Sequence, residues 1–400
     1  LLKKCIFVVS KFFLPFFSIV TVDTYLSIKS NIKLILYSKF KILNLALYNS
    51  DNSQNFDVNL EMRKSLKLEN KPFNKIDESL AKLIPFQIPY IHIEGYKKLL
   101  AKTPLNINKS RVIFSSTGWQ ENELFKLFCA NSIKNPNSTL IGYQHGGYPY
   151  GMTDSPIAYL EKQLVDKYLT WGWSQDEKDI KLISIKISLM KSYFLKKRMG
   201  ETIKDSLLFI STGGSNFFPD GFNVTTGNDW PEYYRDQKYF FKFLEKRIVN
   251  NTKIRLHPSD YLFDNIQRNN FKRINKNFKY DNNKNLKMSL LNTKLVIIDH
   301  LHTTFLETLG TGIPTIIFIN ELIWKPNGQF AKIFNKLKQA NIIHTSPKSA
   351  ASFINSNYSN LDLWWNSQDV KNVLIDLKKN FINLDRNPEK ILAKKLISFS

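Results

Sequence analysis

The sequence predicts an α/β protein with two open parallel sheets in tandem. Two series of alternating strand and helix patterns support this, one over residues 111–171 and one over residues 206–319. The chain has 400 residues with 43% hydrophobic content, enough for two domains that each bury a core. In the second series, the 25 residues of 295–319 hold two buried strands, a polar loop and a short helix.

The amino-terminal part gives the weaker pattern. Residues 1–49 alternate apolar clusters with lysine, which predicts helices, and the polar residues 50–74 predict a loop or an insertion. The strands expected next are short apolar runs at 111–115, 139–143 and 167–171. A turn with an amphipathic helix within 115–133 and a helix around 157–162 separate them. This order of strands and helices predicts a parallel sheet with crossover helices.

The second series begins after a charged segment at 175–204, which is expected to be helical and to lead into the next domain. Its strands are predicted at 206–210, 253–256, 295–298 and 314–319, with helices over 232–249 and 303–312. Residues 330–400 are predicted to be helical, with Trp364 and Trp365 packed on a sheet.

These elements suggest three parts: an α/β domain at 1–200 with a helical start and strands from about residue 111, a second α/β domain at 201–345, and carboxyl-terminal helices at 346–400. Two tandem sheets of this type place their ligand-binding loops at the carboxyl ends of their strands. We therefore expect two Rossmann-like domains that face a cleft, the GT-B-like architecture.

The formal charge of +23 favours anionic partners such as nucleotide diphosphates or an anionic membrane. No basic block with interleaved aromatics indicates nucleic acid. Cys5 and Cys129 suggest neither a disulfide framework nor a metal cluster, which favours the cytoplasm, with the inner face of the cytoplasmic membrane as an alternative. The apolar segment Cys5–Val20 is expected to be a buried helix or a membrane-surface element.

A candidate catalytic loop follows the strand at 139–143. Gln144, His145, Gly146 and Gly147 stand where a ligand meets the carboxyl end of a strand, and the paired glycines permit close approach to the backbone. His145 could serve as the general base for an acceptor hydroxyl, or it could only orient the donor.

Carboxylates and tryptophans near this loop extend the candidate site. Glu161 and Asp154 could orient His145 or act as the base, although Glu161 could equally be a solvated helix residue. Trp171 and Trp173 flank a glycine at the end of the next strand and are read either as core residues or as an acceptor-stacking surface.

The donor site is predicted in the second series. A hydroxyl- and glycine-rich turn at 211–216 offers amides to phosphate oxygens through Ser211, Thr212, Gly213, Gly214 and Ser215. Arg255 and His257 end the next strand and could supply positive charge and a hydrogen bond to a leaving diphosphate.

The helix at 303–312 completes this edge. Thr303 or Thr304 is expected to cap it, Glu307 follows Thr304 at capping-box spacing, and Gly312 ends it. Asp299, His300 and His302 lie on the preceding loop without further clustered ligands, so no metal site is predicted.

Several motifs together resemble a family of transferases encoded among O-antigen and other surface-polysaccharide genes. They are IGYQHGGYPYG, DKYLTWGW, WPEYYRDQ, RLHPSD and TTFLETLGTGIPTI, which span most of residues 110–320, and the beginning KFFLPFFSIVTVDTYLSIK is also similar. More distantly, the chain is similar to capsule Kdo transferases and teichoic-acid glycerophosphotransferases, which are GT-B-like enzymes with cytidine-activated donors.

The resemblance implies roles for matching residues. Gln144, His145 and Gly146 would line the cleft, His257 would approach the donor phosphate, and the Thr303–Glu307 segment would hold phosphate and ribose. It also implies that upstream strands of the first domain are absent from this chain.

The expected function is metal-independent transfer of a sugar from a CMP-, CDP- or UDP-linked donor to a glycan or lipid-linked acceptor of a surface polysaccharide, with no further cofactor. Transfer of a CDP-polyol unit, nucleotide-sugar epimerisation, and a truncated non-catalytic protein that binds glycan or membrane remain alternatives.

Overall fold

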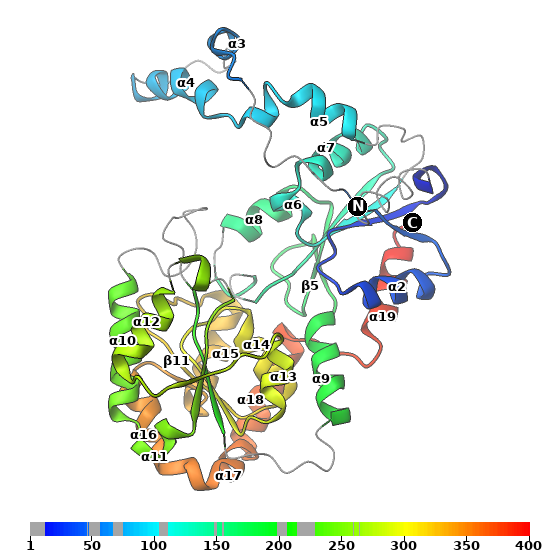
Figure 1. Cartoon of the computed structure of the whole chain (residues 1–400). Coiled ribbons are helices and arrows are strands. Elements are labelled where there is room, and N and C mark those ends of the chain that lie inside the picture. The colour runs from blue at the N-terminus through cyan, green and yellow to red at the C-terminus, as the bar shows by residue number, and fades with distance from the viewer. Residues whose placement is uncertain are drawn as a thin grey trace. The chain divides into compact units, whose positions relative to one another are not determined.

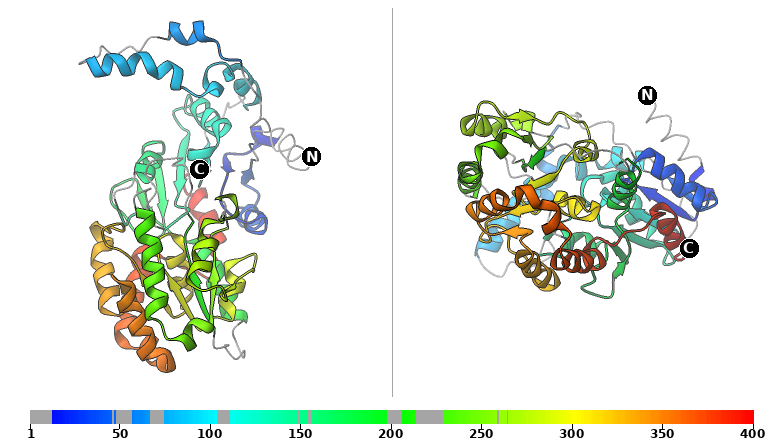
Figure 2. Two further views of the ribbon diagram at one scale, coloured as in Figure 1. Left: turned by 60° about the vertical axis from the view of Figure 1, so that its left-hand side comes forward. Right: turned by 90° about the horizontal axis from the view of Figure 1, so that it is seen from below.

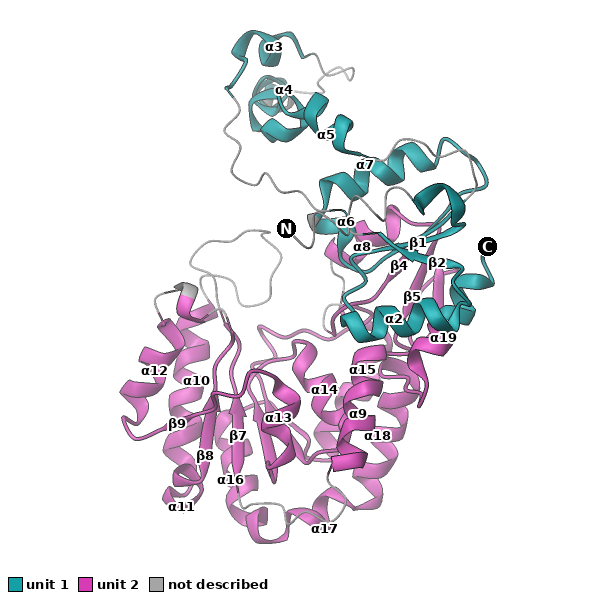
Figure 3. Cartoon of the chain, turned by 45° about the vertical axis from the view of Figure 1, so that its right-hand side comes forward, with its two compact units in different colours: residues 1–141, 393–400 teal, residues 142–392 magenta. Residues whose placement is uncertain are grey.

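The computed structural model describes residues 13–45, 47, 57–66, 75–103, 111–147, 150–153, 156–197, 206–213, 229–258, 260–263 and 265–400. The chain forms two compact units, one of Leu1–Ile141 with Ala393–Ser400 and one of Gly142–Leu392 (Figure 3). The predicted boundary near residue 200 lies outside the described residues and stays a prediction.

The first sheet has the strand order β2-β1-β3-β4-β5-β6. Its strands are β1 (Ile19–Val22), β2 (Ile42–Asn44), β3 (Val112–Ser115), β4 (Thr139–Tyr143), β5 (Lys167–Thr170) and β6 (Asp179–Lys181). The pairs β1–β2, β1–β3 and β5–β6 are parallel. The strands predicted at 111–115, 139–143 and 167–171 are thereby confirmed.

The predicted all-helical start is wrong, because β1 and β2 lie within the first 49 residues. Both strands are short, and Ile19–Val22 is buried at every position. A buried four-residue strand has no polar alternation, so its periodicity cannot be told from that of a buried helix. Strand β6, which has only three residues, was missed inside the segment 175–204 that was expected to be helical.

Unit 1 also carries helices. They are α2 (Ile28–Tyr37), α3 (Leu60–Ser65), α4 (Lys75–Gln87), α5 (Tyr96–Lys102), α6 (Gly118–Glu121) and α7 (Glu123–Ser132), with short 3-10 turns η1 (Leu14–Phe16) and η2 (Tyr90–His92). Helix α3 corrects the expectation of a loop over 50–74. Its buried Arg63 forms a bidentate ion pair with Glu94 and also donates to Pro85 O and Ile88 O. These bonds fasten α3 to the end of α4 and to the residues that follow it, and the two helices are drawn in blue in Figure 2.

The second sheet lies wholly in unit 2 and has the order β12-β11-β10-β7-β8-β9 (Figure 1). Its strands are β7 (Leu207–Ile210), β8 (Thr252–Arg255), β9 (Lys279–Tyr280), β10 (Leu295–Ile298), β11 (Thr315–Phe318) and β12 (Ile343–His344), and neighbouring strands run parallel. The α/β class with two open parallel sheets is thus confirmed. The two-residue strands β9 and β12 were not predicted.

Helices cover both faces of the second sheet. Helix α14 contacts β11, α15 contacts β12, and α16 contacts both strands. From residue 150 on, the described α-helices are α8 (Pro156–Gln163), α9 (Ile185–Lys197), α10 (Trp230–Phe243), α11 (Lys246–Asn250), α12 (Ile266–Ile274), α13 (Leu286–Leu291), α14 (Thr303–Thr311), α15 (Gly328–Gln339), α16 (Pro347–Asn357), α17 (Leu361–Trp365), α18 (Gln368–Phe381) and α19 (Pro388–Ile397). Leu207, Phe209, Leu295 and Ile297 alternate along β7 and β10 into one core with α10 and α16.

Two sequence expectations for these helices need comment. The helix predicted over 232–249 breaks between α10 and α11, where Leu244 has an extended backbone with ψ of 136°. Trp365 is buried, and Trp364 packs against the core and donates its indole N–H to Ala340 O at 2.9 Å. The predicted packing of both tryptophans is confirmed. Over the described residues, none of the helices combines the length and apolarity needed to cross a bilayer.

His344 on β12 gives a pH prediction for the stability of the chain. Burial lowers the pKa of His344 to about 4, against the opposing hydrogen bond to Asn341 O. Below pH 6.5 the unfolded chain takes up a proton that folded His344 does not, so His344 alone should lower the free energy of unfolding toward pH 4 by at most about 1.4 kcal/mol per pH unit. Urea unfolding at pH 7.5, 6 and 5 measures the slope of the whole chain. His344→Asn should reduce this slope by the His344 share, whereas His92→Asn, at a side chain that is 40% exposed, should change it less.

Candidate active site

Gln144 organises the loop that follows β4. Its side chain is fully buried, and its Oε1 accepts hydrogen bonds from Trp171 N–H at 2.8 Å and Trp173 Nε1–H at 2.7 Å. Its Nε2 donates to Gly146 O at 2.7 Å. The amide therefore ties the end of β4 to the end of β5. The predicted substrate contact of Gln144 is not supported, because its polar atoms are buried and engaged within the protein.

Trp171 and Trp173 are core residues. Their relative exposures are 2% and 1%, and the ring of Trp173 packs beside Tyr168 at 6.3 Å between centroids. A stacking surface for an acceptor needs an exposed ring face, so the predicted substrate contact of the two tryptophans is not supported either. Gly172 between them has a φ of +127°, which a residue with a side chain would adopt only with strain.

His145 lies close to the buried carboxylate of Glu161. Its side chain is 19% exposed, and its Nδ1 lies 3.9 Å from Oε1 of Glu161, which is 2% exposed. Tyr150 lies between them: its hydroxyl donates to Glu161 Oε1 at 3.2 Å and is 3.1 Å from His145 Nε2. The solvated-helix reading of Glu161 is therefore wrong. Asp154, the other carboxylate considered, lies outside the described residues.

Tyr168 completes the setting of Glu161. Its hydroxyl donates to Glu161 Oε2 at 2.8 Å. Burial, and next the negative charge of Glu161, raise the pKa of Tyr168 well above its usual value, so the hydroxyl keeps its proton and stays a donor. Sequence reasoning missed both tyrosines. A signal existed for Tyr150 alone, because it lies three residues after the glycine pair, in the same loop.

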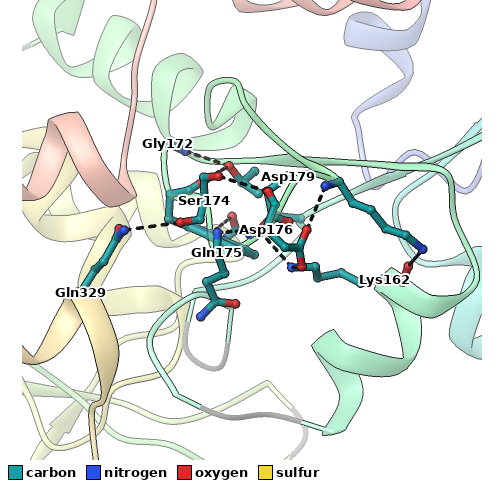
Figure 4. A network of polar contacts seen from close by, with 11 residues as sticks. Lys162, Gly172, Ser174, Gln175, Asp176, Asp179 and Gln329 are labelled. Carbon is teal, nitrogen blue, oxygen red and sulfur yellow. Dashed lines mark hydrogen bonds and ion pairs between the residues drawn. The ribbon is translucent and has the colours of Figure 1, made fainter.

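A second network fixes the turn after β5 (Figure 4). Lys162 Nζ lies 2.9 Å from Asp179 Oδ2, and the same oxygen accepts a hydrogen bond from Gln175 N–H at 2.7 Å. Gln329 of α15 donates to Ser174 O at 3.4 Å. Helix α8 therefore carries two neighbouring residues with different partners. Glu161 lies near His145, and Lys162 forms the ion pair that stabilises the turn after β5. Nothing in the sequence indicated this ion pair.

Gly146 and Gly147 of the loop pack against the first turn of α14. Gly147 N–H donates to Thr303 Oγ1 at 3.1 Å. A Cβ on Gly147 would lie 3.1 Å from Thr303 Cα and 3.0 Å from Leu306 Cδ1, and one on Gly146 would lie 3.3 Å from Thr303 Oγ1. This approach is close enough to favour glycine at both positions. It brings the loop of His145 and the amino end of α14 together inside unit 2.

The expected capping of α14 is wrong. Its N-cap is His302, no side chain caps the helix, and Thr303 is the first helical residue, with its hydroxyl turned to Gly147. Thr304 lies half-buried in the same turn. At the other end Gly312 has a φ of +87° and its N–H bonds Thr308 O and Leu309 O, so the predicted termination at Gly312 is confirmed.

The Gly147–Thr303 hydrogen bond has a testable energetic consequence. Thr303→Val should lower the free energy of unfolding by about 1–3 kcal/mol, because it leaves the buried Gly147 N–H without an acceptor. Thr303→Ser should retain most of the stability. Chemical denaturation measures both, with Thr304→Val in the same turn as the matched control. Equal losses in the Thr303→Val and Thr304→Val variants would contradict the assignment.

Glu307 is buried on α14 and forms an ion pair with Lys186 of α9, with Nζ and Oε1 2.7 Å apart. The pair does not have hydrogen-bond geometry at Oε1. A ribose held by Glu307 would have to share or displace Lys186. The role predicted for Glu307 therefore stays a prediction.

The remaining donor residues gather at the carboxyl edge of β7, β8 and β10, which are neighbours in the sheet. A Cβ on Gly213 would lie 2.8 Å from His257 Cβ, so the ends of β7 and β8 meet there. Ser211 N–H donates to Arg255 O and Thr212 N–H donates to the Tyr233 hydroxyl. Both amide N–H groups thus donate to acceptors within the protein, which corrects the expectation that they are free to bind phosphate. Gly214 and Ser215 lie outside the described residues.

Arg255 does not offer an unpaired charge. Its Nη1 lies 2.5 Å from Asp281 Oδ2 and donates to Asn283 O at 2.9 Å and to Ser289 Oγ at 3.1 Å. The pairing of Ile254 with Tyr280 in the parallel register places Asp281 beside Arg255. The predicted phosphate contact of Arg255 is therefore not supported, because its guanidinium group is neutralised inside unit 2.

Two histidines at this edge have lowered pKa values. Burial first, and then His300, lower the pKa of His257 in spite of Asp260. Burial, His300 and His257 lower the pKa of His302 to about 3. The lowered pKa of His257 favours its neutral form, which can offer the predicted hydrogen bond but not the predicted positive charge.

Asp299 anchors this histidine group. Its Oδ1 lies 3.0 Å from His300 Nδ1, and its Oδ2 accepts a hydrogen bond from Gln237 Nε2 at 2.7 Å. Both Asp299 and His300 are buried. Within the described ranges, no three His, Cys, Asp or Glu side chains lie where they could bind one metal ion.

The family model of the LIC12162 family transferases matches residues 1–396 of this chain. The chain belongs to the LIC12162 family of transferases. No match was found among curated proteins. The prediction from the sequence motifs that the chain belongs to a transferase family is thereby confirmed.

Solved structures similar to this LIC12162 family transferase include three glycan-related proteins. The glycosyltransferase WaaG, involved in lipopolysaccharide biosynthesis, has 10% identity and a TM-score of 0.39 over 94% of this chain and 99% of its own. The wall teichoic acid polymerase TagF has 12% identity and a TM-score of 0.35 over 92% of this chain and 93% of its own. The glycosyltransferase SnogD from Streptomyces nogalater has 8% identity and a TM-score of 0.37 over 96% of this chain and 100% of its own.

Proposed function

We propose that this LIC12162 family transferase moves a sugar from a nucleotide-activated donor to a hydroxyl of a surface-polysaccharide acceptor, with inversion at the sugar carbon. The observation that carries the proposal is the direct contact of the His145 loop with the first turn of α14, through Gly147 and Thr303. It joins a candidate base to a candidate phosphate site within one compact unit.

The donor side uses the amino end of α14 and His257. Helix α14 has nine residues, and the amides of its first turn carry the positive end of the helix dipole. Together with a hydrogen bond from His257, this end stabilises the negative charge that grows on the leaving phosphate. The donor is a CMP-, CDP- or UDP-linked sugar, and Glu307 lies in the second turn of the same helix, where it reaches the ribose after Lys186 moves aside.

The acceptor side uses His145. The Tyr150 hydroxyl donates to Glu161 and lies 3.1 Å from Nε2 and 3.4 Å from Nδ1 of His145, so it orients the imidazole ring. The unprotonated ring nitrogen of His145 takes the proton of the acceptor hydroxyl while that oxygen bonds to the anomeric carbon. The bond from this carbon to the phosphate oxygen breaks, and its electron pair leaves with the nucleotide. Glu161, 3.9 Å from Nδ1, stabilises the imidazolium ion that results.

The proposed reaction needs no metal ion, since the helix dipole and hydrogen bonds serve the leaving group. Treatment with EDTA followed by removal of the chelator should change the turnover rate less than about twofold, measured with the cognate donor. A loss of activity that added Mg²⁺ or Mn²⁺ restores would show that the leaving phosphate depends on a metal.

The nucleotide is found by thermal unfolding in the presence of CMP, CDP, UDP, GDP and their sugars. A ligand that binds only the native state at 100 times its Kd stabilises it by about 2.7 kcal/mol. One nucleotide series should raise the melting temperature, and Thr304→Ala with His257→Ala should abolish the shift. A folded sample that responds to none of these ligands would favour a non-catalytic protein.

A further inference from the structure

The surface of α2 in unit 1 carries an apolar stripe that faces solvent. Ile28, Ile32 and Leu36 follow each other at four-residue spacing with relative exposures of 82%, 53% and 54%. The opposite side of the helix is buried through Ser30 and Leu34. Helix α2 packs beside β2, so the stripe points away from the sheet that supports the helix. Three large aliphatic side chains on one exposed face are unusual on a soluble surface.

The turn after α2 adds an exposed aromatic. Lys39 and Phe40 adopt left-handed conformations with φ of 53° and 60°, and their N–H groups donate to Leu36 O and Ile35 O, each at 3.0 Å. In such a helix end the residue at the place of Phe40 commonly packs back on the helix. Phe40 instead is 65% exposed. The strained turn therefore holds a bulky aromatic ring outward.

A second aromatic lies at the same edge of the sheet. Ile19 of β1 pairs with Ile42 of β2 in parallel register. Phe16 and Phe40 stand shortly before these two residues, so both precede the strands at the amino edge. Phe16 is 72% exposed. The apolar stripe of α2 thus continues into a rim with two exposed phenylalanines.

The charge of this surface has one sign. Lys29, Lys33, Lys39 and Lys41 lie on α2 and its following turn, and residues 24–50 contain neither aspartate nor glutamate. On the helix, Lys29 and Lys33 follow Ile28 and Ile32 by one position each, so the cationic row runs along the apolar stripe. A helix with an apolar stripe bordered by lysines is typical of elements that lie in the headgroup region of an anionic bilayer.

We infer that α2 and the turn 38–41 dock unit 1 on the surface of an anionic lipid bilayer. Ile28, Ile32, Leu36 and Phe40 enter the boundary between headgroups and acyl chains, and the four lysines bind the lipid phosphates. A protein partner or a second copy of the chain would not require a surface free of acidic groups over 27 residues, 24–50. The inference goes beyond the proposed function and does not depend on turnover.

Vesicle sedimentation of the full chain tests the inference. The protein should bind vesicles of phosphatidylglycerol and phosphatidylcholine, bind phosphatidylcholine alone at least tenfold more weakly, and lose most binding in 0.5 M salt, because exposed charges are screened. Ile32→Ser with Leu36→Ser, and separately Lys29→Glu with Lys33→Glu, should each lower the partition coefficient at least tenfold.

The matched control is Lys371→Glu with Ile375→Ser on α18, which changes an exposed lysine and an isoleucine that is 62% exposed. It should bind vesicles as the parent chain does. Unchanged melting curves would show that all variants fold. Failure of the parent chain to bind anionic vesicles, or equal losses in the α2 and α18 variants, would overturn the inference. So would a concentration-dependent dimer that only the α2 variants abolish, with vesicle binding intact.

Discussion

His145→Ala is expected to lower kcat by about 10² to 10⁴-fold, the usual contribution of a positioned general base. His145 is partly exposed on a loop, so its removal leaves the buried pair of Glu161 and Tyr150 in place. Nucleotide binding should persist, because the donor contacts lie on α14 and at His257. Steady-state kinetics with the cognate donor measures the loss, and thermal stabilisation by the nucleotide measures binding.

The control for this variant is His92→Ala. The side chain of His92 is 40% exposed and lies in unit 1, 3.2 Å from Glu123. It should leave kcat unchanged. Glu161→Gln provides a graded test, since it keeps the shape of the side chain and removes the charge that stabilises the imidazolium ion; kcat should fall with little change in KM. An unchanged kcat in His145→Ala would show that another group takes the proton.

Gly147→Val is expected to lower kcat/KM by about 10²-fold, because misplacing catalytic groups by about 1 Å costs rates of this order. Even a Cβ at this position would lie 3.1 Å from Thr303 Cα, which is backbone and cannot rotate away. The two γ-carbons of valine must push the His145 loop from α14. Gly147→Ala should show a smaller loss in the same kinetic assay.

The control for the glycine variant is Gly328→Ala. Gly328 has a φ of +53°, and an added Cβ would meet no atom within 4 Å, so this change introduces backbone strain without a clash. It should cost about 1–2 kcal/mol of stability and leave kcat/KM near that of the parent. Normal kinetics of the Gly147→Val enzyme would show that the position of the His145 loop does not affect the reaction. This result would contradict a site shared by the loop and the amino end of α14.

The parts of the fold that the sequence predicted well are those with long or sharply bounded patterns. The segment from β10 through α14 to β11 has two strands buried at every position and a glycine stop. Strands β2, β6, β9 and β12 escaped prediction, because two or three residues hold too little periodicity. Strand β1 has four residues, but it continues the apolar run around Pro15 and has no clear beginning in the sequence. Pairing with distant strands defines them.

The site was predicted less completely, for reasons of the same kind. The loop from Gln144 to Gly147 was recognised by its glycines, but the Gln144 amide turned inward to Trp171 and Trp173. Arg255 was taken as a free cation, yet Asp281, 26 residues away, neutralises it. Local sequence shows which groups stand at a strand end. Partners supplied by other elements decide whether those groups face a ligand.

The most direct test of the account is the mass of the product. The protein is incubated with the nucleotide sugar that stabilises it and with lipid-linked glycan extracted from a cell envelope, and the lipid-linked products are analysed by mass spectrometry. The account predicts an acceptor heavier by one sugar residue, with one nucleotide released per transfer and at least about 100-fold less of this product from His145→Ala in the same time. An acceptor that gains a phosphate-containing unit, or a donor that is isomerised without any acceptor, would contradict glycosyl transfer.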